Sequence, residues 1–339
     1  MGWFRKSDRS GKWDLESVVH PWDGRTAIYA HIKEHIAPGV IGLTDGGDRL
    51  PDEKDDGGFK WVAGGLDGAV GHHVGGGSDK SRASVLHRAL KVVLDDASAV
   101  KVKTLYDQLL QVSLLGFIDP LLRRIIEKQD LDADRLEALA LWIAKNSPDR
   151  EPVKFAIALL GMIPGSDHAE LLLALGRHEE LTLYSAVALT NAAGGEAERK
   201  LFELAKHVDG WGRIQVVERL AKTSDAEIKA WMLREGYKNS VMYEYLAYTC
   251  AVAGGLRGAL EREAVDPAVL GGAGDIIQAL IAGGPAENMD DYADGAVVVE
   301  RYLHHLGPEP REIDQLIAVD CVQRFFLDEK EADWKARPT

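Results

Sequence analysis

The chain has 339 residues, of which 46% are hydrophobic, and its formal net charge is −14. The hydrophobic fraction is enough for a sizeable core and excludes global disorder. The acidic balance disfavours nucleic acid and anionic membrane surfaces as partners, because both are bound through concentrated Lys and Arg, and it fits a solubilising surface or a basic protein partner.

The chain begins with a short charged stretch, Met1–Arg9, and no apolar stretch follows it. No run approaches the ~20 apolar residues that span a bilayer. The two cysteines, Cys250 and Cys321, form no CxxC pair, so neither a zinc knuckle nor a disulfide framework is indicated. We therefore expect a cytoplasmic protein without a signal peptide or a membrane span.

Residues 1–78 are predicted to form an irregular, glycine-rich N-terminal cap. The pattern predicts one helix there, Thr26–Ile36, which the sequence Ala37-Pro38-Gly39 ends. Short extended pieces are expected near Val40–Leu43 and Phe59–Val62.

The predicted cap helix carries the pattern H-x-x-E-H over residues 31–35. Residues four apart share a helix face, so His31 and His35 could hold one metal ion. Glu34 would then serve as general base on bound water, as in the inverzincin proteases that this motif resembles. The glycine-rich loop offers three candidates for the third ligand: Asp67, His72 and His73.

The same helix has a second interpretation. Ile28, Ile32 and Ile36 form an apolar stripe, so the helix could simply pack on the helices that follow, with the two histidines on its flanks. We therefore predict no cofactor and keep a divalent metal at this motif as the alternative.

Residues 79–330 are predicted to be helices, followed by a flexible tail at 331–339. Apolar residues recur there at helical spacing, and Gly, Pro and Asp mark frequent breaks. Side-chain caps of helices are expected at four candidate positions: Ser78 or Asp79, Asp132 and Ser147.

Two interleaved series of apolar segments recur with a step of 30 residues. The first series begins at 156, 186, 216, 246 and 276, with the sequences AIALLG, AVALTN, VVERLA, LAYTCA and IIQALI. The second begins at 141, 171, 201 and 231, with the sequences LWIAK, LLLAL, LFELA and WMLRE. Two series at one period predict two helices per repeat, which stack because one pair cannot bury its apolar stripe alone.

This pattern resembles the HEAT-like family of α-solenoids over about residues 130–285. Its step is shorter than the ~40–47 residues of HEAT and armadillo repeats, and it is similar to the short HEAT-like repeats of phycobilin lyases and deoxyhypusine hydroxylase. The latter family binds iron through several His-Glu pairs, whereas this chain has one, His178-Glu179. The resemblance implies an all-α solenoid of helix pairs and does not extend to the iron site.

The period also assigns rows of equivalent positions to the first series of helices. Small and aliphatic residues at 157, 187, 217, 247 and at 160, 190, 220, 250 suit a shared core. The rows at 154, 184, 214, 244 and at 158, 188, 218, 248 vary in chemistry, as an exposed groove would.

These variable rows, with the aromatic and arginine residues near them, predict a groove for a protein partner, because Trp, Tyr and Arg are the usual hot-spot types. The alternative is that Trp211 and Tyr243 pack in the core or in turns, with Arg213 and Glu218 as a structural pair. The candidate groove residues are Lys154, Tyr184, Trp211, Arg213, Glu218, Tyr243, Glu244 and Tyr248.

Several short segments are similar to a group of bacterial proteins that carry the name limonene hydroxylase: Asp209–Ile214, Val217–Leu220, Ala63–Gly68 with Gly71–His73, and Gly283–Pro285. The resemblance covers most of the chain and implies monooxygenase or dehydrogenase activity on small terpenes. The residues themselves show no GxGxxG string between a strand and a helix, no P-loop, and no cysteine in a haem-ligand context.

The first functional expectation is a protein-binding scaffold or an immunity-like inhibitor that acts through the groove, with a protein partner of basic charge. The alternative is an enzyme, either metal-dependent at the N-terminal cap or an oxidoreductase of small molecules.

Overall fold

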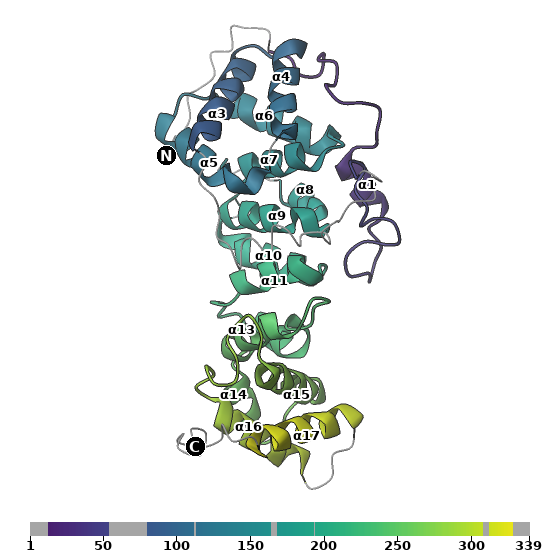
Figure 1. Cartoon of the computed structure of the whole chain (residues 1–339), viewed down its shortest axis with the longest axis vertical. Coiled ribbons are helices and arrows are strands. Elements are labelled where there is room, and N and C mark those ends of the chain that lie inside the picture. Colours follow the sequence, from purple (N-terminus) through teal and green to yellow (C-terminus); the bar gives the residue numbers. More distant parts are fainter. Residues whose placement is uncertain are drawn as a thin grey trace. The chain divides into compact units, whose positions relative to one another are not determined.

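The computed structural model describes residues 13–53, 80–111, 113–163, 168–192, 194–307 and 312–327 (Figure 1). Within these ranges every regular element is a helix and no strand occurs. The expectation of an all-α chain is therefore confirmed for this part of the sequence. None of the helices described is long and apolar enough to cross a membrane.

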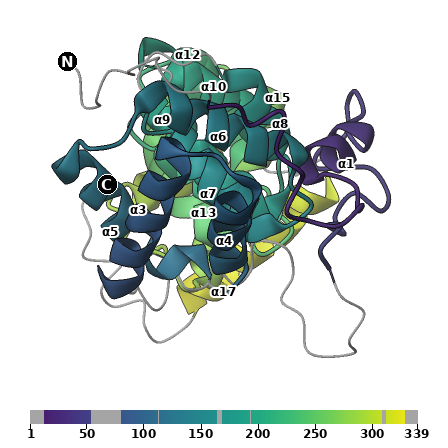
Figure 2. The ribbon, with the colours of Figure 1, turned by 90° about the horizontal axis from the view of Figure 1, so that it is seen from above.

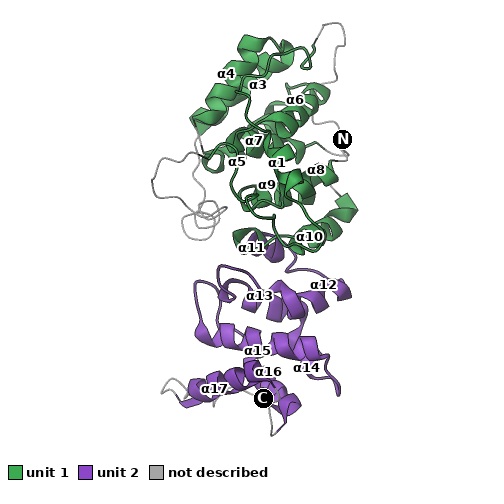
Figure 3. Ribbon diagram, turned by 90° about the vertical axis from the view of Figure 1, so that its right-hand side faces the viewer, with its two compact units in different colours: residues 1–212 green, residues 213–339 purple. Residues whose placement is uncertain are grey.

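The chain divides into two compact units, residues 1–212 and 213–339, coloured green and purple in Figure 3. The division falls inside α11 (Gly210–Arg219). The predicted cap boundary at 78 and the tail boundary at 330 both lie outside the described residues, so that division of the chain stays a prediction.

Unit 1 is a set of helices that pack as neighbours in pairs. α6 packs on α7, and α8 on α9, while α7 also packs on α9 and α8 on α10. α3 packs on α4 and α5, and α1 lies at the margin of the unit beside α6 and α8 (Figure 2). The elements are α1 (Ile28–Glu34), α3 (Lys80–Asp95), α4 (Ala99–Leu110), η1 (Leu114–Gly116), α5 (Ile118–Lys128), α6 (Ala133–Asn146), α7 (Arg150–Leu160), α8 (Ala169–Leu175), α9 (Glu179–Ala192), η2 (Gly194–Glu196) and α10 (Ala197–Ala205).

Unit 2 repeats this manner of packing with different helices. α13 packs on α15 and α15 on α17, while α12 continues into η3, a π-helical turn that contacts both α13 and α15. The elements are α12 (Ala226–Trp231), η3 (Met232–Gly236), α13 (Glu244–Gly254), α14 (Leu256–Leu260), α15 (Pro267–Ala282), α16 (Gly295–Leu306) and α17 (Ile313–Leu327).

The two apolar series of the sequence lie on alternating helices. The segments of the first series lie on α7, α9, α11, α13 and α15, and those of the second on α6, α8, α10 and α12 with η3. Within unit 1, α7 contacts α9 and α8 contacts α10, and within unit 2, α13 contacts α15. In each of these contacts the apolar stripe of one helix covers that of the next helix of the same series.

The predicted helix caps are in part correct. The Asp132 side chain accepts a hydrogen bond from the Arg135 backbone N–H and caps α6, as expected. The prediction for Ser147 is wrong, because this residue ends α6 and Asp149 stands at the N-cap of α7. The Ser147 hydroxyl instead bonds to the Asp149 backbone and to the Tyr106 hydroxyl. Ser78 and Asp79 lie outside the described residues.

The predicted helix of the N-terminal region is α1, which lies within the expected range and is followed by Gly39 at a φ of 75°. The expected extended piece at Val40–Leu43 is a series of bends rather than a strand. Its backbone has no strand partner and instead bonds at Gly42 N to the His207 carbonyl at 2.9 Å. The other expected piece, Phe59–Val62, lies outside the described residues.

Candidate functional site

The two histidines of the H-x-x-E-H motif lie together on α1. Their ring centroids are 4.5 Å apart, as the shared helix face predicts. His35 Nδ1 lies 2.8 Å from the His31 carbonyl, and His31 Nε2 lies 3.3 Å from the Gly47 carbonyl. One ring nitrogen of each histidine is therefore engaged by backbone oxygen, and Glu34 is exposed.

The third ligand of the predicted metal site cannot be placed, since Asp67, His72 and His73 lie outside the described residues. Over the ranges that are described, no three His, Cys, Asp or Glu side chains gather as a metal site. The metal site stays a prediction. The second interpretation of α1 has direct support in Ile28 and Ile32, which are fully buried where the helix packs on α6 and α8.

In unit 1, the rows that the sequence assigns to an exposed groove are mostly interior. Lys154 and Tyr184 are 3% and 5% exposed, and the Lys154 ammonium lies 5.5 Å from the Tyr184 ring centroid. The expectation that these two residues face solvent is wrong, because Lys154 is drawn inward by Glu180 at 2.9 Å and by Glu151 at 3.3 Å. Trp211 is also buried, and its backbone N–H donates to Glu179.

The candidate groove residues of unit 2 divide into buried and accessible ones. Arg213 is 4% exposed and donates to the backbone carbonyls of Lys238 and Glu235, so its expected exposure is likewise wrong. The other four are at least partly accessible, with Tyr243 exposed and the remaining three half-buried: Glu218, Tyr243, Glu244 and Tyr248.

The register of α9 differs from that of its equivalents. Val187 and Thr190, assigned to core rows, are exposed, whereas Ile157 and Leu160 in the same rows of α7 are fully buried. Positions 30 residues apart have the same burial only where the two helices have the same rotation about their own axes. The rows are therefore a good guide to which segments are helical and a poor guide to which side of α9 is buried.

A charged cluster that the sequence did not reveal joins the N-terminal region to α7 and α9. The Arg150 guanidinium holds both carboxylate oxygens of Asp52 at 3.0 to 3.1 Å, and the Arg150 backbone N–H donates to the same carboxylate. Glu180 lies 3.4 Å from Arg150 and 2.9 Å from Lys154. His178, also buried, contacts the Asp48 carbonyl at 3.0 Å.

The charges of this cluster set one another's protonation. Burial would raise the pKa of Glu180, but Lys154 and Arg150 outweigh burial, and the pKa is lowered. Burial lowers the pKa of His178 despite its bond to the Asp48 carbonyl. Glu180 is therefore ionised beside Lys154 and Arg150, with a neutral histidine next to it, which suits a structural contact between these elements.

A second set of side-chain contacts fixes residues 20–25 on the helices of unit 1. The Trp22 ring lies 4.8 Å from the rings of His20 and Trp142 and 5.0 Å from that of Tyr106. Arg25 donates to Asp149 at 2.9 Å, and the Tyr106 hydroxyl donates to the same carboxylate at 2.6 Å. Because Trp13 also bonds to the α3 carbonyl of Val93, the described N-terminal residues run along the sides of several helices of unit 1.

Glu179 is a carboxylate with a different environment. It accepts a hydrogen bond from the Trp211 backbone N–H at 3.1 Å and so caps the first turn of α11. Burial raises its pKa to about 7, against the opposing effect of that hydrogen bond. Gly210 has a φ of 54°, and a Cβ there would collide with this carboxylate. Glu179 thus serves as a structural cap of α11.

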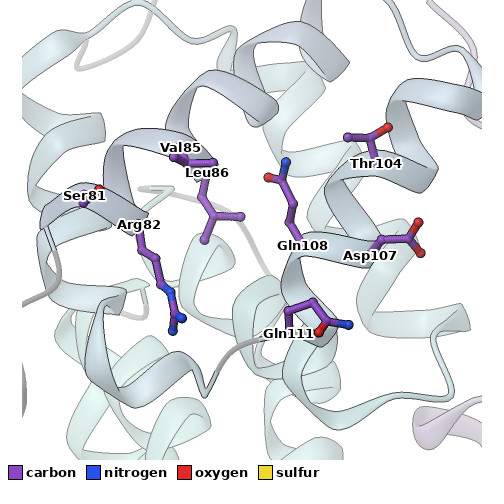
Figure 4. A pocket seen from close by; sticks show the side chains of 8 residues that line it. All are labelled: Ser81, Arg82, Val85, Leu86, Thr104, Asp107, Gln108 and Gln111. Atoms are coloured by element: carbon purple, nitrogen blue, oxygen red, sulfur yellow. The ribbon is translucent and has the colours of Figure 1, made fainter.

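A cleft in unit 1 lies between α3 and α4. It has a volume of about 480 Å³, within the usual range of ligand pockets. Leu86 of α3 and Gln108 of α4 point into the space between the two helices (Figure 4). The cleft is lined by Ser81, Arg82, Val85, Leu86, Thr104, Asp107, Gln108 and Gln111.

The chemistry of this cleft is an apolar floor with a polar rim. Leu86 is 3% exposed and forms the floor, and Val85, 40% exposed, continues it toward solvent. Gln108 and Gln111 bring two side-chain amides, and the Gln108 Oε1 atom is buried without a hydrogen-bond partner in the described structure. A partner that inserts an apolar side chain and donates from an amide would complement these groups.

Sequence reasoning missed the cleft because α3 and α4 precede the repeating segments. One feature of the sequence was available: Val85 and Leu86 are adjacent apolar residues. They make the apolar stripe of this helix wider than is needed to cover the core on one face of the helix. The partner residues on α4 gave no comparable signal, since Thr, Asp and Gln are ordinary residues of a solvated helix face.

A smaller hollow of about 240 Å³ lies where Ile36, at the end of α1, meets α8 and α10. Arg177 lines it opposite Glu203 and His207, and burial lowers the pKa of this arginine although Glu203 acts in the opposite direction. Two glutamates and one arginine give it a mixed polar lining that is less suited to an apolar anchor than the cleft between α3 and α4.

The cysteines occupy ordinary positions. Both are free, and Cys250 is fully buried in α13, where burial raises the pKa of the thiol. A protonated, enclosed thiol is a poor metal or haem ligand. Comparisons of the chain with protein-family models, with curated proteins and with solved structures give no match.

Proposed function

We propose that this chain is a protein-binding scaffold of HEAT-like helix pairs, and that the cleft between α3 and α4 receives a peptide segment of its partner. The alternation of the two apolar series on successive helices supports the repeat architecture. Stacked helix pairs offer extended surfaces that bind other proteins, and helix-lined grooves commonly receive an apolar-faced peptide.

The observation that carries the proposal is the composition of the cleft. An aliphatic side chain from a partner would cover Leu86 and Val85, and peptide amides would pair with Gln108 and Gln111. This combination of an apolar anchor and backbone-directed hydrogen bonds suits a peptide segment, because every peptide supplies both donors and acceptors along its backbone.

The partner is proposed to be basic. The chain carries a net charge of −14, which speeds the encounter with a basic protein and disfavours acidic ones. Either an inhibitor that neutralises a basic protein or a scaffold that holds one would fit this charge. The cleft replaces the originally expected groove, because Lys154, Tyr184, Trp211 and Arg213 are buried.

Selection of peptides from a random displayed library on the immobilised wild-type chain tests this proposal. We expect selected peptides to carry an apolar residue flanked by Lys or Arg, and to bind the chain in solution by fluorescence anisotropy. Val85→Asp should weaken the binding of a selected peptide by about tenfold or more, since it puts a charge on the apolar floor.

The matched control is Val187→Asp on α9, because Val187 and Val85 are 38% and 40% exposed and both lie in unit 1. Binding that survives Val85→Asp but fails in Val187→Asp would move the site to α9 and contradict the proposal. Circular dichroism and thermal unfolding of both variants establish that each remains folded.

A further inference from the structure

The last described helix of unit 2, α17, has one covered and one open face. It packs on α15, and its fully covered residues are Ala318 and Val322. The opposite side carries four large aliphatic side chains that are 51 to 75% exposed: Ile313, Leu316, Ile317 and Leu327. At 3.6 residues per turn these four positions fall on one face of the helix.

This concentration is unusual within the described part of unit 2. Elsewhere in that unit, large hydrophobic side chains that are exposed occur as Val252 on α13 and as Met242 with Tyr243 just before it. A contiguous exposed aliphatic face of this kind indicates a surface that another molecule covers.

The charges on this face identify what covers it. Asp320 and Arg324 lie among the aliphatic residues, 2.8 Å apart, with their side chains 55% and 77% exposed. One acid and one base leave the face with no net charge, so it offers no attraction for a basic partner. The pair is instead complementary to itself when the helix is reversed.

We propose that a second copy of this chain docks on this face, with α17 of one copy antiparallel to α17 of the other. In a pairing centred on position 322, Asp320 of each copy lies opposite Arg324 of the other, because both are two residues from the centre. Ile317 and Leu327 lie opposite each other in the same way, five residues from the centre on either side. The interface is isologous, so each contact occurs twice.

The dimer is weak and depends on concentration. A single helix pair buries less area than the ~1,200–2,000 Å² of a standard stable interface. The inference is independent of the peptide cleft, since it concerns a different unit, a different chemistry and a different partner. Sedimentation equilibrium of the full chain, from micromolar to near-millimolar concentration, should show the average mass rising from that of one chain toward that of two.

Variants of the aliphatic residues test the surface. Ile317→Asp should raise the dimer dissociation constant by at least about tenfold, because the lost apolar contact occurs twice. Val252→Asp on α13 is the matched control, since Val252 is 52% exposed and Ile317 is 51% exposed. This control should leave the dissociation constant unchanged.

Variants of the charges test the antiparallel arrangement. Asp320→Arg alone and Arg324→Asp alone should each weaken the dimer, because each places like charges opposite one another. The double variant with both changes should dimerise as the wild type does, and an equimolar mixture of the two single variants should form the heterodimer. A wild-type chain that stays monomeric throughout the range, a double variant no better than the single ones, or equal loss in Val252→Asp would each overturn the proposal.

Discussion

Within unit 1 and within unit 2, neighbouring helices contact each other through different chemistry. α7 and α9 meet around buried charges, where Lys154 lies between Glu151 and Glu180. η3 and α15 meet through glycine, since a Cβ at Gly272 would overlap the Leu233 carbonyl oxygen. One period in the sequence is thus compatible with a contact held by ion pairs and with one held by close backbone approach.

The difference shows what a repeat does and does not conserve. The spacing marks which segments form helices with an apolar stripe, and each stripe is covered by a neighbouring helix of the same unit. The contact itself can use whatever fills the space between two backbones, provided that buried charges are paired and close approaches lack a side chain.

The largest effect is expected from breaking the charged contact. Lys154→Met leaves Glu180 buried beside a single, more distant arginine, so we expect the free energy of unfolding of unit 1 to fall by about 3–5 kcal/mol. Lys103→Met is the control, since Lys103 and Asp107 form an exposed pair whose side chains are 57% and 52% accessible. Loss of this exposed pair should change the free energy of unfolding, measured by urea titration, by less than about 1 kcal/mol. Equal effects of Lys154→Met and Lys103→Met would show that the enclosed ion pairs matter no more than the exposed one.

The pH dependence of stability separates the two adjacent carboxylates of α9. The pKa of Glu179 is raised from 4.5 to about 7, so the folded chain keeps a proton that the unfolded chain releases. Its contribution to stability is full below pH 4.5 and declines up to pH 7, by up to about 3 kcal/mol. Glu179→Gln should remove this decline.

Glu180 is the matched comparison, because its pKa is lowered and its contribution has the opposite sign. That contribution is present above the ordinary pKa of a glutamate and is lost as the pH falls. Glu180→Gln should therefore destabilise the chain at neutral pH and have less effect in acid. The free energy of unfolding of each variant, relative to the wild type, would be measured from pH 4 to 8. A difference that changes with pH in the same direction for both variants would refute this assignment.

A smaller effect is expected from the glycine contact of unit 2. Gly272→Ala should destabilise unit 2 by about 1–3 kcal/mol, because the added methyl group forces α15 away from η3. Gly271→Ala, at the preceding position of the same helix, would meet no atom within 4 Å. It should stabilise the chain by roughly 0.5–1 kcal/mol through helix propensity, and thermal unfolding of the two variants measures the difference.

The helical architecture could be predicted from the sequence because it depends on local periodicity. The AIALLG segment at 156 and the LLLAL segment at 171 each contain enough information to be recognised as helix. The burial of Lys154 could not be predicted, since it depends on Glu180, which is on another helix. The same holds for Arg150, whose partner Asp52 is 98 residues away in the sequence.

The candidate site was harder to predict than the fold. The sequence directed attention to the variable rows of the repeat, yet Tyr184 and Arg213 are buried. The cleft depends instead on the spacing between α3 and α4, which places Leu86 opposite Gln108 (Figure 4). Distances between helices are not encoded in the periodicity of either one.

The central claim, that a peptide segment of the partner enters the cleft between α3 and α4, is tested most directly by hydrogen–deuterium exchange. The wild-type chain would be measured alone and with a saturating, library-selected peptide. We predict slower exchange in residues 81–86 and 104–111 on binding, and no change in α17. Unchanged exchange in both cleft segments, with protection appearing elsewhere in the chain, would contradict the account.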